Sequence, residues 1–125
     1  MGRSLRIVVA DDDPDTVLMV AVLLRDEGHA VRTARNGPDA IAPVREFNPD
    51  VVFVDIAMPN MNGWDVVREI RKMNRHTPPL LVAMSGRYVQ ASDQAFGSMA
   101  GFHHYLLKPY GSDELLSVLE PLLGE

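Results

Sequence analysis

Five short runs rich in Val, Ile and Leu divide the chain at fairly regular intervals, and they constrain its fold more than any other feature. They cover residues 5–10, 30–34, 50–54, 80–84 and 104–107. Most of them are almost continuously apolar, as is typical of strands that helices cover on both faces. Longer amphipathic stretches separate the runs, and this alternation favours strand–helix units around a parallel sheet. We therefore predict an α/β fold of the doubly wound (βα)5 type, flavodoxin-like, with five parallel strands.

Helix-starting signals precede most of the amphipathic stretches. Polar residues that can open a helix stand at Asp13, Asn36, Asn62 and Ser112. Pro43 is expected to kink or shorten the second helix, and Pro121 is expected to end the fifth. The fourth helix, over residues 89–100, has the weakest propensity because it contains Gly97 and several polar residues.

The composition excludes several classes of protein. The chain of 125 residues has the size of one domain, so we predict a single domain over residues 1–125. The absence of cysteine excludes a disulfide scaffold and a cysteine zinc site. A net charge of −5 argues against a nucleic-acid surface, and the longest apolar stretch is far shorter than the roughly 20 residues of a membrane span. We expect a cytoplasmic domain that binds neither nucleic acid nor membrane.

Charged and polar side chains follow four of the predicted strands. They are the carboxylates of Asp11, Asp12 and Asp55, the hydroxyl of Ser85 and the ammonium group of Lys108. In open parallel sheets, ligands bind beyond the carboxyl ends of the strands, so these groups are expected to share one rim. Three carboxylates at short distance repel one another, and a bound divalent cation removes that cost. Oxygen ligands of this kind suit Mg²⁺ or Mn²⁺.

The same rim suits phosphoryl chemistry. Lys108 beside the carboxylates adds a positive charge that can contact a phosphoryl oxygen. A metal ion, a lysine and a small hydroxyl around one carboxylate can stabilise in-line transfer of a phosphoryl group onto that carboxylate. The loop at residues 11–13 does not suit a nucleotide-phosphate cradle, because it presents carboxylates where such a cradle needs glycines and free backbone N–H groups.

Four motifs agree with these strand ends in order and spacing. They are VVADDDP at residues 8–14, DIAMPNMNG at 55–63, MSG at 84–86 and YLLKPY at 105–110. With these motifs the chain closely resembles the receiver domain of two-component response regulators, a phosphoacceptor module similar to the bacterial chemotaxis regulator. The resemblance covers essentially the whole chain. It implies phosphorelay signalling, with self-catalysed phosphotransfer and slow autodephosphorylation in place of enzymatic turnover, and no output domain in this chain.

By this resemblance Asp55 is the residue that becomes phosphorylated. Asp12 binds Mg²⁺ directly, whereas Asp11 acts largely through water. The carboxylate of Asp55 and the backbone carbonyl of Ala57 complete the metal ligands that the family provides.

The resemblance also implies how the phosphoryl group is held and reported. Lys108 contacts one phosphoryl oxygen, Ser85 donates a hydrogen bond to the group, and Tyr105 is an aromatic switch whose ring moves inward with Ser85. The Lys108–Pro109 peptide is expected to be cis, a conformer largely confined to bonds that precede proline. The switched output surface comprises residues 89–100, the fifth strand and the fifth helix, and two copies of the chain can pair through it.

The first helix is expected to dock the phosphoryl donor. Residues 17–24 are apolar around the whole helix, so periodicity does not choose its buried face. The family's packing turns Met19, Val20 and Leu23 inward. It leaves Val17, Leu18 and Ala21 near the surface. We expect these side chains, with the loops of the site, to dock the helical bundle of a histidine kinase or a histidine phosphotransfer domain.

Two other functions remain open from the sequence. A phosphatase resembling the haloacid dehalogenase group would use Asp11 as nucleophile and Asp13 as general acid. Against it, Pro14-Asp15 stands where that group has Gly-Thr, and 125 residues leave no room for a substrate cap. A receiver that binds partners without being phosphorylated is the other function, and the complete set of acidic residues together with Lys108 argues against it.

Overall fold

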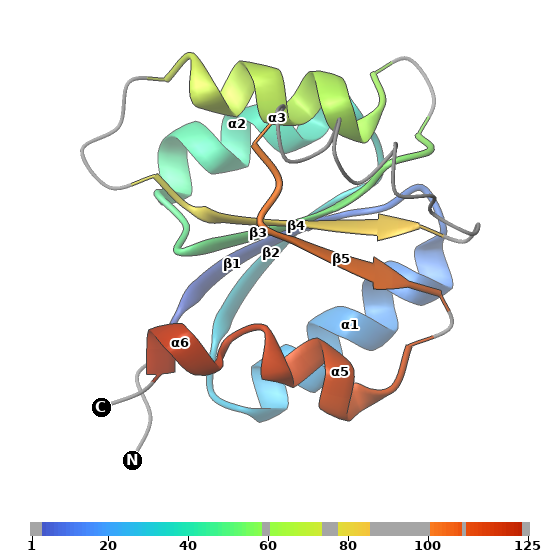
Figure 1. Cartoon of the computed structure of the whole chain (residues 1–125), viewed down its shortest axis with the longest axis vertical. Coiled ribbons are helices and arrows are strands. Elements are labelled where there is room, and N and C mark those ends of the chain that lie inside the picture. Colours follow the sequence, from blue (N-terminus) through green and yellow to red (C-terminus); the bar gives the residue numbers. More distant parts are fainter. Residues whose placement is uncertain (1–3, 59–60, 74–77, 86–100, 109, 124–125) are drawn as a thin grey trace.

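A computed structural model describes residues 4–58, 61–73, 78–85, 101–108 and 110–123 of the chain. Its centre is a five-stranded parallel sheet with the strand order β2-β1-β3-β4-β5 (Figure 1). The strands are β1 (Arg6–Ala10), β2 (Ala30–Ala34), β3 (Val51–Asp55), β4 (Leu80–Ser85) and β5 (His104–Leu107). The predicted doubly wound fold is confirmed, and the ends of each strand lie within one residue of the predicted run.

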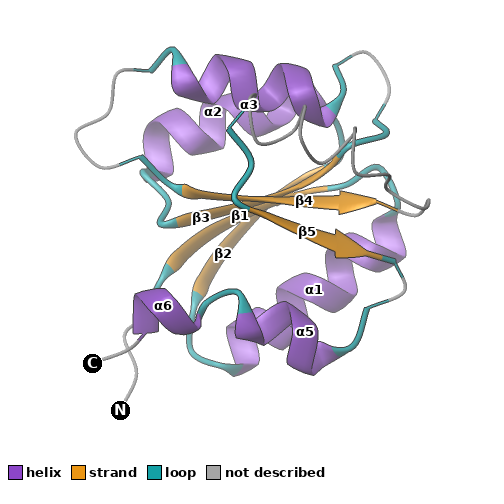
Figure 2. Cartoon of the chain, in the orientation of Figure 1, coloured by secondary structure: helices purple, strands orange, loops and turns teal. Residues whose placement is uncertain are grey.

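Helices cover both faces of the sheet. They are α1 (Pro14–Asp26), α2 (Gly37–Phe47), α3 (Gly63–Arg71), α5 (Ser112–Ser117) and α6 (Glu120–Leu123). Figure 2 shows α2 and α3 on one face of the sheet and α1 and α5 on the other. The predicted helix over residues 89–100 lies outside the described residues. Among the helices that are described, none is both long enough and apolar enough to cross a membrane.

Two hydrophobic cores lie on either side of the sheet. Phe53 belongs to the core beneath α1 and α5, where it is joined by Leu24 and Leu115. Its neighbour Val52 belongs to the core beneath α2 and α3, which also contains Val44. Adjacent residues of a strand point to opposite faces, so a strand between two cores must be apolar at nearly every position. This is the physical reason for the uninterrupted runs in the sequence.

The predicted helix starts at Asp13, Asn36 and Asn62 are present as N-caps. Each of these side chains accepts a hydrogen bond from a backbone N–H group two or three residues further along the chain. Such caps satisfy N–H groups that the first helical turn leaves without partners. They fix where α1, α2 and α3 begin, immediately after the carboxyl ends of β1, β2 and the loop after β3.

Pro43 lies inside its helix, where the predicted kink stays a prediction, and Pro121 acts differently from the prediction. Pro43 does not end α2, which continues for four residues to Phe47 while Val44 packs in the core. Tertiary packing thus outweighs the backbone hydrogen bond that this proline removes. Pro121 does not end the fifth helix either: α5 already ends at Ser117, and Pro121 lies in the first turn of α6, where its missing N–H group has no intrahelical partner to lose.

The buried face of α1 corrects the prediction in part, because Val20 is buried and Leu23 packs against the core as predicted. Its buried side chains are Val17, Val20, Ala21 and Leu24. Their spacing places them on one face of a helix, so Val17 and Ala21 belong to the interior and not to the surface. Met19, predicted to point inward, is 60% exposed, whereas Leu18 is 63% exposed as predicted. Because the segment is apolar on every side, only contacts with the sheet decide which face is buried.

Candidate functional site

The carboxyl ends of four strands bring polar residues to one rim of the sheet. Asp11 follows β1, Asp55 is the last residue of β3, Ser85 is the last residue of β4, and Lys108 follows β5. Carboxylate oxygens of Asp11, Asp12 and Asp55 all lie within 4.8 Å of one another. The structure therefore brings together the three carboxylates that the sequence places at strand ends.

Lys108 reaches two of these carboxylates from the end of the edge strand β5. Its Nζ lies 2.6 Å from Oδ2 of Asp11 and 3.6 Å from Oδ2 of Asp55. Asp11 is fully buried, and the side chain of Asp55 is 8% exposed. The lysine is thus closely paired with Asp11 and more loosely with Asp55, which keeps some access to solvent.

Backbone N–H groups orient both buried carboxylates. The backbone N–H of Asp13 donates to Oδ1 of Asp11 over 3.0 Å, and that of Ala57 donates to Oδ1 of Asp55 over 3.2 Å. The backbone N–H of Lys108 donates to the carbonyl oxygen of Ser85 over 2.6 Å, which ties the end of β5 to the end of β4. The site is therefore held by main-chain contacts as well as by the ion pair.

The electrostatics of the site disfavour a charge on Asp55. Burial raises the pKa of the Asp55 carboxyl from 3.8 to about 6, and the neighbouring Asp11 carboxylate adds to this rise. Burial alone would lower the pKa of Lys108, but its hydrogen bond to Asp11 and the charges of both aspartates outweigh burial and raise that pKa. The charge of Lys108 therefore offsets only part of the cost of ionising Asp55.

This donor set fits a divalent metal ion. Three ionised carboxylates and one lysine leave a formal charge of −2 within a few ångström, and all of the carboxylate ligands are hard oxygen atoms. Asp12 is exposed, whereas Asp11 and Asp55 are buried, so the cluster has one open side. A small cation with some water ligands matches both the charge and the donor chemistry.

The remaining predicted residues lie in β4, in β5 and in the segment after β3. Ser85 is half-buried at the end of β4, and Ala57 is exposed two residues after Asp55. Tyr105 is half-buried in β5, with its ring centroid 5.8 Å from that of Phe102. Pro109 lies outside the described residues, so the predicted cis peptide stays a prediction.

Two aromatic features of the region were not predicted from the sequence. Burial raises the pKa of Tyr110 to about 12, and its hydroxyl donates to Sδ of Met84 over 3.2 Å. Trp64 packs edge-on against Phe102, with 5.4 Å between the ring centroids. Tyr110 belongs to the YLLKPY motif, which is a signal in the sequence. No local pattern pairs Trp64 with Phe102.

The surroundings of Asp13 argue against the phosphatase alternative. Its carboxylate caps α1 by accepting from the Thr16 hydroxyl over 2.8 Å and from the backbone N–H of Asp15 over 3.2 Å. These hydrogen bonds, the one from Thr16 above all, hold the pKa of Asp13 below its usual value. A general acid needs a raised pKa and a proton to give, and Asp13 has neither.

Comparison with known proteins identifies a family. The sequence model of the response regulator receiver domain matches residues 7–120. The chain is 36% identical over 122 residues to the probable transcriptional regulatory protein TcrX of Mycobacterium tuberculosis, which covers 98% of this chain and 51% of TcrX. It is 34% identical over 119 residues to protein PilH of Pseudomonas aeruginosa, which covers 95% of this chain and 98% of PilH. The chain thus spans about half the length of TcrX and nearly all of PilH.

Solved structures show the same fold. The chemotaxis protein CheY4 of Vibrio cholerae superimposes with a TM-score of 0.89 at 26% identity, over 97% of this chain and 100% of that one. The receiver domain of the sensor histidine kinase PA1611 of Pseudomonas aeruginosa superimposes with a TM-score of 0.85 at 24% identity, over 98% and 100%. In the PA1611 domain, a magnesium ion is coordinated in the active-site cleft.

Proposed function

The chain belongs to the response regulator receiver family, and we propose that it accepts a phosphoryl group on Asp55 in a magnesium-dependent reaction. It is a phosphoacceptor domain of two-component signalling and not a classical enzyme. Its own contribution to chemistry is the transfer onto Asp55 and slow self-catalysed dephosphorylation. We assign these activities to one receiver domain over residues 1–125, working in the cytoplasm where phosphohistidine donors are made.

The observation that carries the assignment is the difference between the two buried carboxylates. Asp11 has no exposed surface, and both of its oxygens are engaged, one by the Asp13 N–H group and one by Lys108 at 2.6 Å. Asp55 keeps one oxygen at the longer distance of 3.6 Å from Lys108 and retains some exposure. A nucleophile must reach the incoming phosphorus atom, so Asp55 is the better candidate.

The reaction is an in-line substitution at phosphorus. An oxygen of Asp55 forms the new P–O bond while the P–N bond of a donor phosphohistidine breaks, and the leaving imidazole nitrogen keeps the electron pair. Lys108 contacts one phosphoryl oxygen, and the hydroxyl of Ser85 donates to another. The carboxylates of Asp11, Asp12 and Asp55 and the carbonyl of Ala57 would hold Mg²⁺, which when bound neutralises charge on the transferring group.

Intact-protein mass spectrometry after incubation with acetyl phosphate tests this proposal. We expect a gain of one phosphoryl group that requires Mg²⁺ and is lost in Asp55→Asn. Asp26→Asn, at the exposed end of α1, is the matched control and should still be phosphorylated. Retention of the gain in Asp55→Asn would refute the assignment, and its loss only in Asp11→Asn would favour the phosphatase-like alternative.

The conformational response follows from the connection between β4 and β5. A phosphoryl group that hydrogen-bonds to Ser85 would pull on the strand end to which the Lys108 backbone N–H is bonded. We propose that Tyr105, half-buried beside Phe102, changes position in response. The affected surface comprises β5, α5 and residues 89–100, and it can also pair two copies of the chain.

A receiver partners with a histidine kinase, and we propose that α1 supplies the docking surface here. Its exposed apolar side chains are Leu18, Met19 and Val22. Beside them, a cavity of about 170 Å³ opens between α1 and α5, lined by Met19, Leu23 and Leu115. The helical bundle of a kinase or phosphotransfer domain can bury such a patch with its phosphohistidine facing the adjacent rim.

The docking surface is tested by Leu18→Lys. We expect this change to slow transfer from a cognate phosphohistidine donor while phosphorylation by acetyl phosphate is unaffected, because the small donor does not need the patch. Equal slowing with both donors would contradict docking at α1. The buried residues Val17 and Ala21 are unsuitable probes, since their replacement would disturb the core.

A further inference from the structure

A close contact joins the start of α2 to the loop that follows the phosphoacceptor strand. Gly37, the first residue of α2, is buried. A Cβ atom at this position would lie 2.6 Å from Cβ and 2.9 Å from Cγ of Met61, and it would also collide with the Met61 carbonyl oxygen. Side chains essentially never approach a Cβ so closely. Met61 can therefore keep its place only while residue 37 is glycine.

The start of α2 is stiffened by its own cap and is anchored in the core one turn later. Oδ1 of Asn36 accepts from the backbone N–H of Asp39 over 2.7 Å, and Nδ2 of Asn36 donates to the carboxylate of Asp39 over 3.0 Å. One turn further on, Ala40 is fully buried in the core. If residue 37 gained a side chain, the helix could not easily retreat, so Met61 and its loop would have to move.

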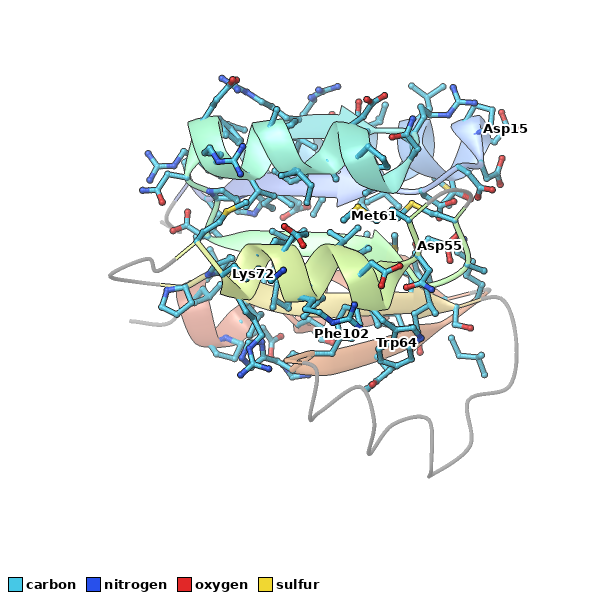
Figure 3. All side chains as sticks on the ribbon, turned by 90° about the horizontal axis from the view of Figure 1, so that it is seen from above. Asp15, Asp55, Met61, Trp64, Lys72 and Phe102 are labelled. Carbon is cyan, nitrogen blue, oxygen red and sulfur yellow. The ribbon has the colours of Figure 1, made fainter. Side chains whose placement is uncertain are left out.

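The loop between Asp55 and α3 is fixed at its far end as well. The backbone N–H of Gly63 donates to the carbonyl oxygen of Ile56 over 2.9 Å. A Cβ atom on residue 63 would lie 2.9 Å from Cα of Ile56 and 3.0 Å from the carbonyl oxygen of Asp55. Met61 and Ile56 are thus each in close contact with the start of a helix. Figure 3 shows Met61 and Asp55 at the same end of α2 and α3.

We propose that Gly37 is a positioning residue for phosphoryl transfer, although no site side chain comes from α2. By allowing Met61 to lie against α2, it fixes the segment from Met61 to Gly63, which contacts Ile56 beside Asp55 and Ala57. The inference rests on the proposed phosphorylation of Asp55. Its physical basis is that small displacements of a reacting group cost a large part of the rate when the geometry of the attack is otherwise held fixed.

Gly37→Ala tests the proposal. We expect phosphorylation by acetyl phosphate to slow by roughly ten- to a hundredfold, and Mg²⁺ to bind more weakly by calorimetry, since Asp55 and Ala57 are ligands of the proposed metal site. Gly28→Ala is the control: Gly28 has a φ of +95°, so alanine is strained there, but nothing lies within 4 Å of the new Cβ. Gly28→Ala should lower stability without changing either the rate or Mg²⁺ binding.

A second background separates positioning from a general loss of stability. Met61→Gly removes the two side-chain contacts, and a glycine at residue 61 can turn its carbonyl oxygen away more easily, so Gly37→Ala should cost less rate in that background than in the wild type. An equal cost in both backgrounds would overturn the proposal. So would failure of Gly37→Ala to fold in both backgrounds, because Gly37 would then serve the fold as a whole.

The outcomes distinguish this inference from the proposed function. If the wild type is phosphorylated and Gly37→Ala matches it in rate and Mg²⁺ affinity, the positioning role is wrong while the function stands. If the wild type is not phosphorylated, the function fails, and the calorimetric comparison still decides whether Gly37 positions the acidic loop.

Discussion

The two ends of the parallel sheet make opposite kinds of polar contact. At the carboxyl ends of the strands, the carboxylates of Asp11 and Asp55 and the ammonium group of Lys108 crowd together with little access to solvent. The two carboxylates repel each other there, and both form an ion pair with the same lysine. The arrangement is poised to receive a cation and a phosphoryl group, and it is electrostatically unfavourable without them.

At the amino ends of the strands, histidine side chains accept hydrogen bonds from the backbone. The N–H group of Leu5, just before β1, donates to Nδ1 of His29 over 3.1 Å. The N–H group of Leu81 in β4 donates to Nδ1 of His103 over 2.9 Å. These contacts satisfy backbone N–H groups at the amino ends of β1 and β4.

The difference places chemistry and stability at opposite ends of one sheet. Burial raises the pKa of Asp55, so its ionised form is disfavoured in the folded protein. Burial lowers the pKa of His29, so its neutral form is favoured. At neutral pH the functional end therefore holds unfavourable charge while the opposite end is in its preferred state. Changes at the two ends should alter stability with opposite dependence on pH.

Lys108→Met should disturb this balance most. It leaves the buried carboxylates of Asp11 and Asp55 without their ammonium partner, and breaking a buried pair in this way costs about 3–5 kcal/mol of unfolding free energy. Urea denaturation in a chelating buffer near neutral pH measures the loss. Saturating Mg²⁺ should recover part of it by replacing the missing positive charge.

Lys72→Met is the control for that change, because Lys72 pairs with Glu69 on the exposed surface of α3. The Lys72→Met variant should lose no more than a few tenths of a kcal/mol of unfolding free energy. If Lys108→Met lowered the unfolding free energy as little as Lys72→Met, or if Mg²⁺ recovered none of the loss, repulsion between the carboxylates would not destabilise the carboxyl end.

Asp55→Asn should raise the unfolding free energy, whereas Lys108→Met lowers it. The folded-state pKa of about 6 lies above the ordinary value of 3.8, so stability falls as pH rises between these values, and the full penalty applies above them. Removing the charge should stabilise the metal-free protein by about 3 kcal/mol at neutral pH, as measured by thermal or urea unfolding. The gain should disappear below about pH 4, where the aspartate is protonated in both states. A destabilised variant at neutral pH would contradict this reasoning.

The fold and most of the acidic rim could be predicted because both follow from local patterns. Uninterrupted apolar runs reveal strands between two layers, and parallel strands bring the residues after their carboxyl ends to one edge. Asp11, Asp55 and Lys108 could therefore be grouped without any knowledge of distances. What the pattern did not give is their unequal pairing, since the 2.6 Å and 3.6 Å contacts depend on where β5 places the lysine.

Features that depend on packing between distant segments were not predictable. In α1, residues 17–24 are apolar on every side, so the orientation that buries Val17 and exposes Met19 is set by contacts with the sheet. The contact between Gly37 and Met61 has the same character. Each residue looks ordinary in its own segment, and their proximity exists only once α2 and the loop after β3 lie side by side.

The smallest expected effect tests the amino end of the sheet. His29 is buried, and its Nδ1 can accept from Leu5 only while that nitrogen carries no proton. Its folded-state pKa lies below the ordinary 6.5, so the unfolded chain takes up the proton first and stability falls as pH falls below that value. His29→Asn keeps an acceptor oxygen near the position of Nδ1 but does not titrate. The variant should lose about 1 kcal/mol less unfolding free energy than the wild type on acidification, as measured by urea unfolding across this pH range.

The sign of this effect sharpens the comparison between the ends. As pH falls, protonation of Asp55 raises the unfolding free energy, whereas protonation of His29 lowers it. The two variants should therefore change the pH profile of stability in opposite directions. His104→Asn, at an exposed position of β5, serves as the control and should leave the profile as it is. If His29→Asn and His104→Asn gave the same profile, the hydrogen bond to Leu5 would contribute nothing to acid sensitivity, and the electrostatic contrast would rest on the carboxyl end alone.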